Sequence, residues 1–188
     1  MRSAFLSALL GACCIAWSGI QVGQAQTAES VPVTERSIKA AYLCKFAGYV
    51  EWPDARIHAA KPLTIGVLES SEMADELIRI TAGRLINDRP VQVRRVTGGD
   101  SLAGLHVLFV GAHEPERLDE LLLPARKLPI LTVTESAGAL SDGSIINFTI
   151  DRERVRFEVS LAAAERSRLK LSSRLLAVAQ RVQRTPES

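Results

Sequence analysis

Short, almost uninterrupted apolar runs, separated by segments with helical spacing, constrain the fold of this 188-residue chain most strongly. Three runs are rich in β-branched residues and have the length of a strand: PLTIGVL at 62–68, LHVLFV at 105–110 and LPILTV at 128–133. A strand without polar alternation is buried on both faces, as in the middle of a parallel sheet. A fourth predicted strand, at 90–96, has one wetter face because glutamine and arginine interrupt its valines.

Segments with helical periodicity separate these strands. Thr34 can cap the first helix, and the break at Trp52-Pro53 ends it, because the residue before proline is pushed out of the helical region. The apolar residues of this helix recur on one face, at Ile38, Tyr42, Phe46 and Tyr49. A second helix is predicted after Ser70 or its neighbour, and a third begins at Pro115, a residue type favoured in the first turn.

The carboxyl-terminal third predicts a β-hairpin and a closing helix. Residues 145–150 and 155–159 have the pattern of two hairpin strands, and residues 161–182 have helical spacing with a break near Arg168. Strands that alternate with helices imply right-handed crossovers and a mainly parallel sheet. We therefore predict a three-layer α/β fold, with helices on both faces of a mainly parallel sheet and a C-terminal β-hairpin followed by a helix. The hairpin is expected to add an antiparallel edge.

The amino terminus has the features of a secretory signal peptide. A basic start is followed by an apolar run over 4–20, and small residues stand at Gly23 and Ala25, where signal peptidase cleaves. We predict a signal peptide over 1–25, a linker over 26–33 and a single α/β domain over 34–184. One alternative is a transmembrane helix, for which the run is short and lacks a basic flank.

A second alternative for the amino terminus is a lipoprotein anchor at Cys13, in the stretch LGAC. The apolar run continues past Cys13, where a processed lipoprotein normally becomes polar. This favours cleavage after Ala25 and secretion without a lipid anchor. Cys44 would then be the only thiol left in the chain, and its apolar helical segment predicts burial.

Charge and motif content argue against several classes of function. The formal charge is only +2, from 23 basic and 21 acidic residues, and 5% of residues are aromatic, so nucleic acid is a poor candidate partner. The sequence has no glycine-rich phosphate loop, nucleophile elbow or metal-ligand spacing. We therefore predict no catalytic residue, no metal and no cofactor. His106, within an apolar strand, is expected to be a satisfied structural histidine.

Several ordered blocks resemble the YfiR family of small secreted proteins. IKAAYLCKFAGYVEWP at 38–53 is similar to the opening helix of that family. HVLFVG at 106–111 and PILTVTE at 129–135 resemble two of its later blocks, and the longest block is GSIINFTIDRERVRFEVSLAAAERSRLKLSSRLLAVA at 143–179. Together the blocks cover essentially the whole expected mature chain, and their order makes the resemblance specific.

The resemblance implies a regulator and not an enzyme. Proteins of this family are periplasmic and hold an inner-membrane diguanylate cyclase in check through its periplasmic part, which limits cyclic-di-GMP synthesis and biofilm formation. An OmpA-like outer-membrane lipoprotein can draw the regulator away, and family habit implies a homodimer. The redox behaviour of some members does not carry over, because Leu105 stands where a cysteine often precedes the histidine of that block.

The resemblance and the helix end together give candidate partner-binding residues: Tyr49, Glu51 and Trp52, which bring aromatic surface and charge to one place. The competing interpretation is that the aromatic residues are core, and we expect Trp52 to be buried. Two other functions stay open. A periplasmic small-molecule sensor or binding protein would hold its ligand at the carboxyl ends of the parallel strands, near 69–71, 111–114 and 135–138. The other is a hydrolase of unfamiliar type.

We predict that the exported protein begins near Gln26. The basic start, the apolar run and the Gly-x-Ala site together direct cleavage there. Amino-terminal sequencing of the periplasmic fraction is expected to give Gln26-Thr27-Ala28. An intact Met1 or a lipid on Cys13 would contradict the prediction.

Overall fold

Strands alternate with helices along most of the chain. The computed structural model describes residues 34–53, 62–113 and 115–184. The predicted signal peptide, the linker and Cys13 lie outside these residues. The described helices are α1 (Glu35–Gly48), α2 (Ser71–Thr81), α3 (Pro115–Leu122), α4 (Leu161–Arg166) and α5 (Ser173–Val178). The described strands are β1 (Val50–Glu51), β2 (Leu63–Leu68), β3 (Leu85–Ile86), β4 (Arg89–Val96), β5 (Val107–Val110), β6 (Leu131–Thr134), β7 (Ile146–Asp151), β8 (Arg154–Ser160), β9 (Lys170–Leu171) and β10 (Arg181–Gln183).

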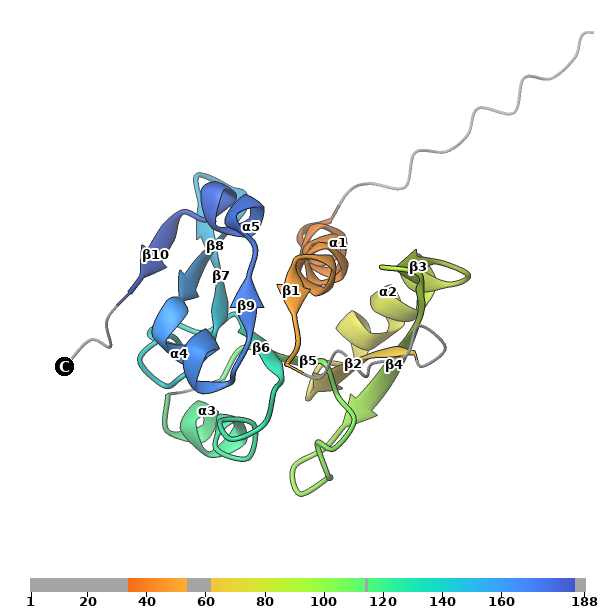
Figure 1. Ribbon diagram of the computed structural model, residues 1–188, viewed down its shortest axis with the longest axis horizontal. Helices are drawn as coiled ribbons and strands as arrows, with labels where there is room; N and C mark the ends of the chain where they lie inside the picture. The colour runs from red at the N-terminus through yellow and green to blue at the C-terminus, as the bar shows by residue number, and fades with distance from the viewer. Residues whose placement is uncertain (1–33, 54–61, 114, 185–188) are drawn as a thin grey trace, which may run out of the picture. The chain divides into compact units, whose positions relative to one another are not determined.

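Eight of the described strands form one mixed, mostly parallel sheet in the order β10-β8-β7-β6-β5-β2-β4-β3 (Figure 1). The five strands from β4 to β7 in this order are parallel to one another. β3 and β8 run antiparallel to β4 and β7, and β10 pairs parallel with β8. The order of the parallel strands is that of a doubly wound fold, whose switch point lies between β2 and β5. A separate antiparallel pair joins β1 to β9.

The central strands are buried on both faces, as their sequences predict. In β5, Val107 and Phe109 belong to the core that α1, α2, α4 and α5 cover, whereas Leu108 and Val110 belong to a second core under α3. Successive side chains of a strand point to opposite faces, so one apolar run supplies both cores. The predicted three-layer α/β fold is confirmed, with α3 on one face and the other helices on the opposite face (Figure 1).

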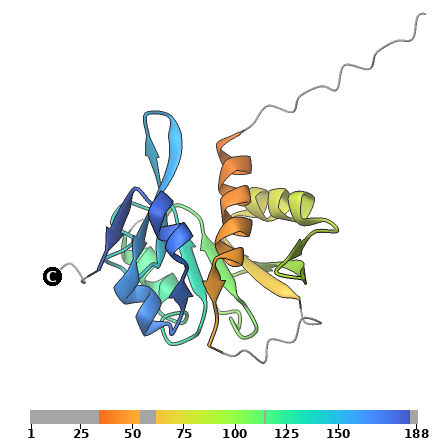
Figure 2. The ribbon, with the colours of Figure 1, turned by 45° about the horizontal axis from the view of Figure 1, so that its top comes forward.

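α1 carries the largest aromatic cluster and lies beside α2 (Figure 2). Thr34 caps it as predicted, because the hydroxyl oxygen accepts a hydrogen bond of 3.1 Å from a backbone N–H three residues later. The ring of Phe46 stacks on Tyr42 and Phe148 and meets Phe157 edge-on, with centroids 4.8–5.7 Å apart. Aromatic pairs at this spacing add to the energy of burying the rings. The cluster fixes α1 on the hairpin β7–β8.

The buried face of α1 differs from the predicted one. Lys39, Leu43 and Ala47 are buried, whereas Ile38 and Tyr42 are half-buried. Lys39 can be buried because its ammonium group pairs with two carboxylates, Glu35 Oε1 at 2.5 Å and Glu135 Oε2 at 2.6 Å. α1 also ends at Gly48 and not at the predicted break, since the chain then extends into β1. Cys44 is half-buried, and burial raises the pKa of its thiol.

The prediction of helical structure over 161–182 is correct for α4 and α5 and wrong for the two short strands β9 and β10. These residues form α4, then β9, then the short α5 and finally β10. Arg168 has a φ of 57° and stops α4, while β9 and β10 find partners in β1 and β8. The break near Arg168 is confirmed. Ser172 caps α5, because its Oγ accepts from the N–H of Leu175 at 3.3 Å. β10 also lies outside β8, so the hairpin is not the edge of the sheet.

Phe46→Ala is expected to destabilise the protein by about 3–5 kcal/mol, the usual cost of removing a fully packed ring from a core. Phe46 is 2% exposed and contacts three other rings. Urea unfolding followed by circular dichroism measures the change. The control is Ile150→Ala, because Ile150 is 53% exposed and its removal is expected to cost less than about 1 kcal/mol. Equal losses for the two variants would contradict the assignment of the core.

Candidate functional site

The chain after α1 separates the three predicted partner-binding residues. Tyr49 follows the last turn of α1 and is 38% exposed. Glu51 is exposed, because side chains of a strand alternate and Val50 is buried. Trp52, for which burial is predicted, is half-buried and packs against the larger core. Tyr49 and Trp52 line two different cavities, one between α1 and α5 and one at the amino ends of the central strands.

Backbone pairing joins the end of α1 to the start of α5. In the two-stranded pair, Val50 lies opposite Leu171 and Glu51 opposite Lys170. The N–H of Ser172 then donates to the carbonyl oxygen of Tyr49 at 3.0 Å. Because Ser172 also caps α5, this joint places α5 next to the last turns of α1.

The helices α1 and α5 enclose a groove of about 470 Å³, the α1–α5 groove. Its floor is formed by the buried side chains of Phe46, Phe157 and Leu175. Tyr49 and Val178 are exposed at its edge, and Val178 is 64% exposed. The remaining lining residues are Tyr42, Lys45, Arg174 and Ala177. An apolar side chain of a partner could therefore be covered on several sides.

The charge of the α1–α5 groove is positive. Among the described residues that line it, Lys45 and Arg174 are basic and none is acidic. Both are exposed, so they can meet an acidic group on a partner without first breaking an ion pair within the groove. Such complementarity contributes mainly to the association rate and to the choice of partner. The groove is therefore suited to an amphipathic segment with acidic and apolar side chains.

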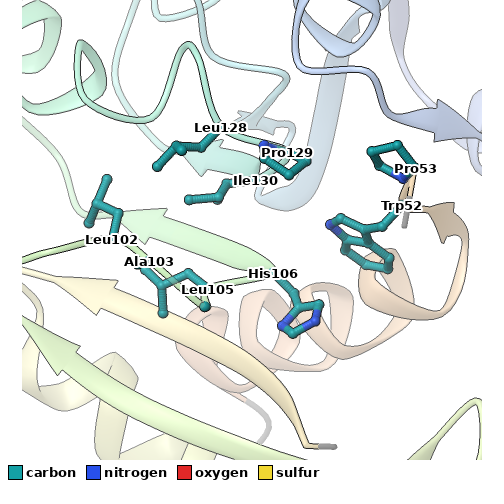
Figure 3. Close-up of a pocket in the computed structure, with 10 residues that line it drawn as sticks. Trp52, Pro53, Leu102, Ala103, Leu105, His106, Leu128, Pro129 and Ile130 are labelled. Carbon is teal, nitrogen blue, oxygen red and sulfur yellow. The ribbon is translucent and has the colours of Figure 1, made fainter. Parts of the chain in front are cut away.

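Trp52 and His106 form a second site at the amino ends of the strands (Figure 3). Their rings meet edge to face, with centroids 5.6 Å apart and an interplanar angle of 78°. The N–H of Thr64 donates to His106 Nδ1 at 3.1 Å, and Arg89 Nη2 lies 3.0 Å from Nε2. Burial, and then the charge of Arg89, lower the pKa of His106 to about 4. The ring is therefore neutral at pH 7. A neutral imidazole has one acceptor nitrogen, so it accepts from only one of these two donors.

A charged cluster lies at the carboxyl ends of the strands, where a ligand of a sensor is expected. His113 Nε2 is 2.6 Å from Glu69, which also accepts from Arg117 at 2.6 Å. The hydrogen bond to His113, with help from Arg117, lowers the pKa of Glu69. The Lys39–Glu135 pair borders a cavity of about 420 Å³ in the same region. The structure therefore brings the segments around 69–71, 111–113 and 135–138 together, but their charges largely satisfy one another.

Within residues 34–53, 62–113 and 115–184, no three His, Cys, Asp or Glu side chains lie where they could hold a metal ion together. None of the helices in these segments is long and apolar enough to span a membrane.

The family profile described as YfiR/HmsC-like matches residues 36–180. The match runs from the first turn of α1 to the residue before β10, so it includes both walls of the α1–α5 groove and the Trp52 site. The chain belongs to the YfiR/HmsC-like family. No individually curated protein matches the sequence.

Membership of the YfiR/HmsC-like family directs attention to surfaces that could contact another protein. Sequence reasoning placed Tyr49 near such a surface but missed Lys45, Arg174 and Val178. Lys45 precedes Tyr49 by four residues at the end of the predicted first helix. Helical spacing alone could therefore have placed these two side chains next to each other. The positions of Arg174 and Val178 could not be found in this way, because the predicted helical segment over 161–182, even with its break near Arg168, gives no reason for α5 to pack beside α1.

We expect protonation of His106 to destabilise the folded protein. Its pKa is about 4 when folded and near the ordinary 6.5 when unfolded, so between these values the unfolded chain binds more protons. Stability therefore falls as pH is lowered through this window. At pH 5 the loss due to His106 is up to about 2 kcal/mol, and less after screening by solvent.

The measurement is urea unfolding at pH 7.5 and pH 5 for the natural protein and for His106→Gln, which cannot be protonated. Glutamine keeps a hydrogen-bond acceptor and a donor at this position. The stability of the variant at pH 7.5 shows what the substitution itself costs, apart from any effect of protonation. The natural protein is expected to lose more stability on acidification than the variant. Equal losses would show that His106 does not titrate in this way.

Proposed function

We propose that the protein is a periplasmic regulator that binds the periplasmic part of an inner-membrane diguanylate cyclase and inhibits it, thereby controlling cyclic-di-GMP signalling and biofilm formation. Membership of the YfiR/HmsC-like family is the observation that carries this proposal. The protein acts by binding and not as an enzyme. It reaches the periplasm through the signal peptide over 1–25, and its domain over 34–184 is the regulatory unit.

In this proposal the α1–α5 groove is where the cyclase binds. Exposed apolar residues such as Val178 and Tyr49 give up water when they are covered, which favours association. Lys45 and Arg174 select a partner segment with acidic side chains. Glu51 is exposed in β1 but does not line the groove, so it would meet the cyclase beside the groove and not within it. Trp52 lines the other cavity, so it does not contact the cyclase directly.

Inhibition follows from a difference in affinity. A regulator that binds the inactive conformation of the cyclase more tightly than the active one shifts the population toward the inactive form. A tenfold preference corresponds to about 1.4 kcal/mol, which is within the contribution of one well-covered apolar side chain. An OmpA-like outer-membrane lipoprotein that competes for the regulator would release the cyclase, and a homodimer would present the groove twice.

A second candidate function is supported by the charged cluster at the carboxyl ends of the strands. A small polar molecule in the cavity bordered by Lys39 and Glu135 would occupy the usual ligand position of a doubly wound fold. The protein would then be a periplasmic sensor or binding protein. Its ligand would have to compete with the ion pairs that Lys39 and Glu69 already make.

Deletion of the gene is expected to raise cyclic-di-GMP and biofilm formation in a strain that expresses the partner cyclase. Loss of the regulator leaves the active conformation of the cyclase without a competitor. Cyclic-di-GMP is measured in cell extracts, and the natural gene restores the lower level. An unchanged level after deletion would contradict the inhibitory function and favour the sensor.

Val178→Asp tests the groove itself. The carboxylate repels acidic groups of the partner and removes apolar contact, so binding to the periplasmic part of the cyclase is expected to weaken by about 30-fold or more. Leu123→Asp is the matched control, because Leu123 is 59% exposed but lies after α3, away from the groove. Both variants should melt like the natural protein. If Leu123→Asp relieves repression and Val178→Asp does not, the cyclase binds elsewhere.

A further inference from the structure

The cavity beside Trp52 lies at the amino ends of β5 and β6 (Figure 3). The charged cluster lies at the opposite, carboxyl ends of these strands. Its volume is about 180 Å³. The walls come from the end of β1, from the loop before β5 and from the turn before β6. They are mainly apolar, with Leu102, Leu105, Leu128, Pro129 and Ile130 prominent among them.

The indole N–H of Trp52 is buried and has no hydrogen-bond acceptor among the described residues. Buried donors of native proteins almost always have a partner, because an unpaired one loses its bond to water without compensation. In Figure 3 the indole nitrogen is turned toward the space flanked by Pro129 and Ile130. The cavity therefore contains one unmet donor in otherwise apolar surroundings.

His106 also lines the cavity, but it does not accept a hydrogen bond from Trp52 Nε1. A neutral His106 has one acceptor nitrogen, and both of its nitrogens face donors outside the cavity, the N–H of Thr64 and Arg89 Nη2. A water molecule would also be held poorly, because an ordered internal water normally makes about three hydrogen bonds and needs at least two polar partners. An apolar molecule with a single acceptor satisfies the site better than water.

The volume limits the size of such a molecule. An engineered apolar cavity of about 150 Å³ in another protein stays dry and binds benzene. A cavity of about 180 Å³ therefore has room for one six-membered ring with a short substituent. Neither the apolar walls nor the engaged His106 offers a partner for a charge.

We propose that this cavity is a binding site for a small, uncharged molecule that consists of one ring-sized apolar body and one hydrogen-bond acceptor, with Trp52 Nε1 as the donor to that acceptor. The site is independent of the proposed contact between the α1–α5 groove and a cyclase. It also differs in position and chemistry from the polar ligand site of the sensor function, which lies at the carboxyl ends of the strands.

The test compares two probes, acetophenone and ethylbenzene, on the full exported protein. The probes are similar in size, and only acetophenone has a carbonyl oxygen that can accept from Trp52. Binding is followed by the backbone N–H signals of the residues that line the cavity, in two-dimensional nitrogen–proton NMR spectra of every variant. The indole N–H signal, assigned by its loss in Trp52→Phe, reports the hydrogen bond itself. Acetophenone is expected to bind about tenfold more tightly than ethylbenzene and to move the indole signal downfield, because one hydrogen bond is worth about this factor.

Variants separate the donor from the cavity. Trp52→Phe keeps a ring but lacks the N–H, so the two probes should bind it equally. Ala103→Phe adds a ring at an exposed position that lines the cavity and should reduce binding of both probes at least tenfold. Ala177→Phe is its matched control, because Ala177 is also exposed but lines the α1–α5 groove, and it should bind both probes like the natural protein.

The proposal is overturned if neither probe binds, if both bind the natural protein equally, or if Trp52→Phe still prefers acetophenone. Binding that survives in Ala103→Phe but is lost in Ala177→Phe would place the ligand in the groove. Melting curves show whether each variant is folded, and Trp52→Phe alone decides the question if Ala103→Phe is not. No cyclase is present, so this result does not depend on the proposed regulatory function.

Discussion

Burial of the central strands on both faces is the constraint on which the rest of the structure depends. Val107 and Phe109 of β5 point into one core, and Leu108 and Val110 point into the other. A strand of this kind needs a layer of helices on each side, because an uncovered face would leave a continuous apolar surface in water. Neither face of these strands is then free for a ligand or partner. Binding features must lie at the ends of the strands or between the helices, which is where the groove, the Trp52 cavity and the charged cluster are found.

Local sequence patterns predict well those elements whose structure depends only on residues within one short segment. Uninterrupted apolar runs gave the strands β2, β5 and β6, and the alternation after Ile145 gave the hairpin β7–β8. The end of the chain was predicted less well. Helical spacing over 161–182 correctly indicated α4 and α5, but β9 and β10 exist because β1 and β8 offer them backbone partners. A distant partner of this kind leaves no trace in a local pattern.

The candidate site shows the same limit. Aromatic residues at the end of the first helix are visible in the sequence, and Tyr49 does line the α1–α5 groove. Whether Trp52 joins the same surface depends on the direction of β1, which turns the two side chains into different cavities. Arg174 and Val178 complete the groove only because the joint between Tyr49 and Ser172 places α5 beside α1. The sequence identifies the family and the wall of the groove that α1 forms. The wall that α5 forms depends on the β1–β9 pair, which joins segments about 120 residues apart.

The strand β1 connects the Trp52 cavity to the α1–α5 groove. Trp52 follows it directly, Tyr49 precedes it, and its partner β9 leads into Ser172, which caps α5. Any coupling between the two cavities would therefore run through a strand of only two residues. Coupling between two sites is reciprocal, so a ligand that favours one arrangement of the groove would itself bind more tightly when a partner holds that arrangement. A tenfold effect needs about 1.4 kcal/mol, the energy of a single hydrogen bond such as the one from Ser172 to Tyr49. A coupling of this size would need no more than the loss or gain of that one backbone contact.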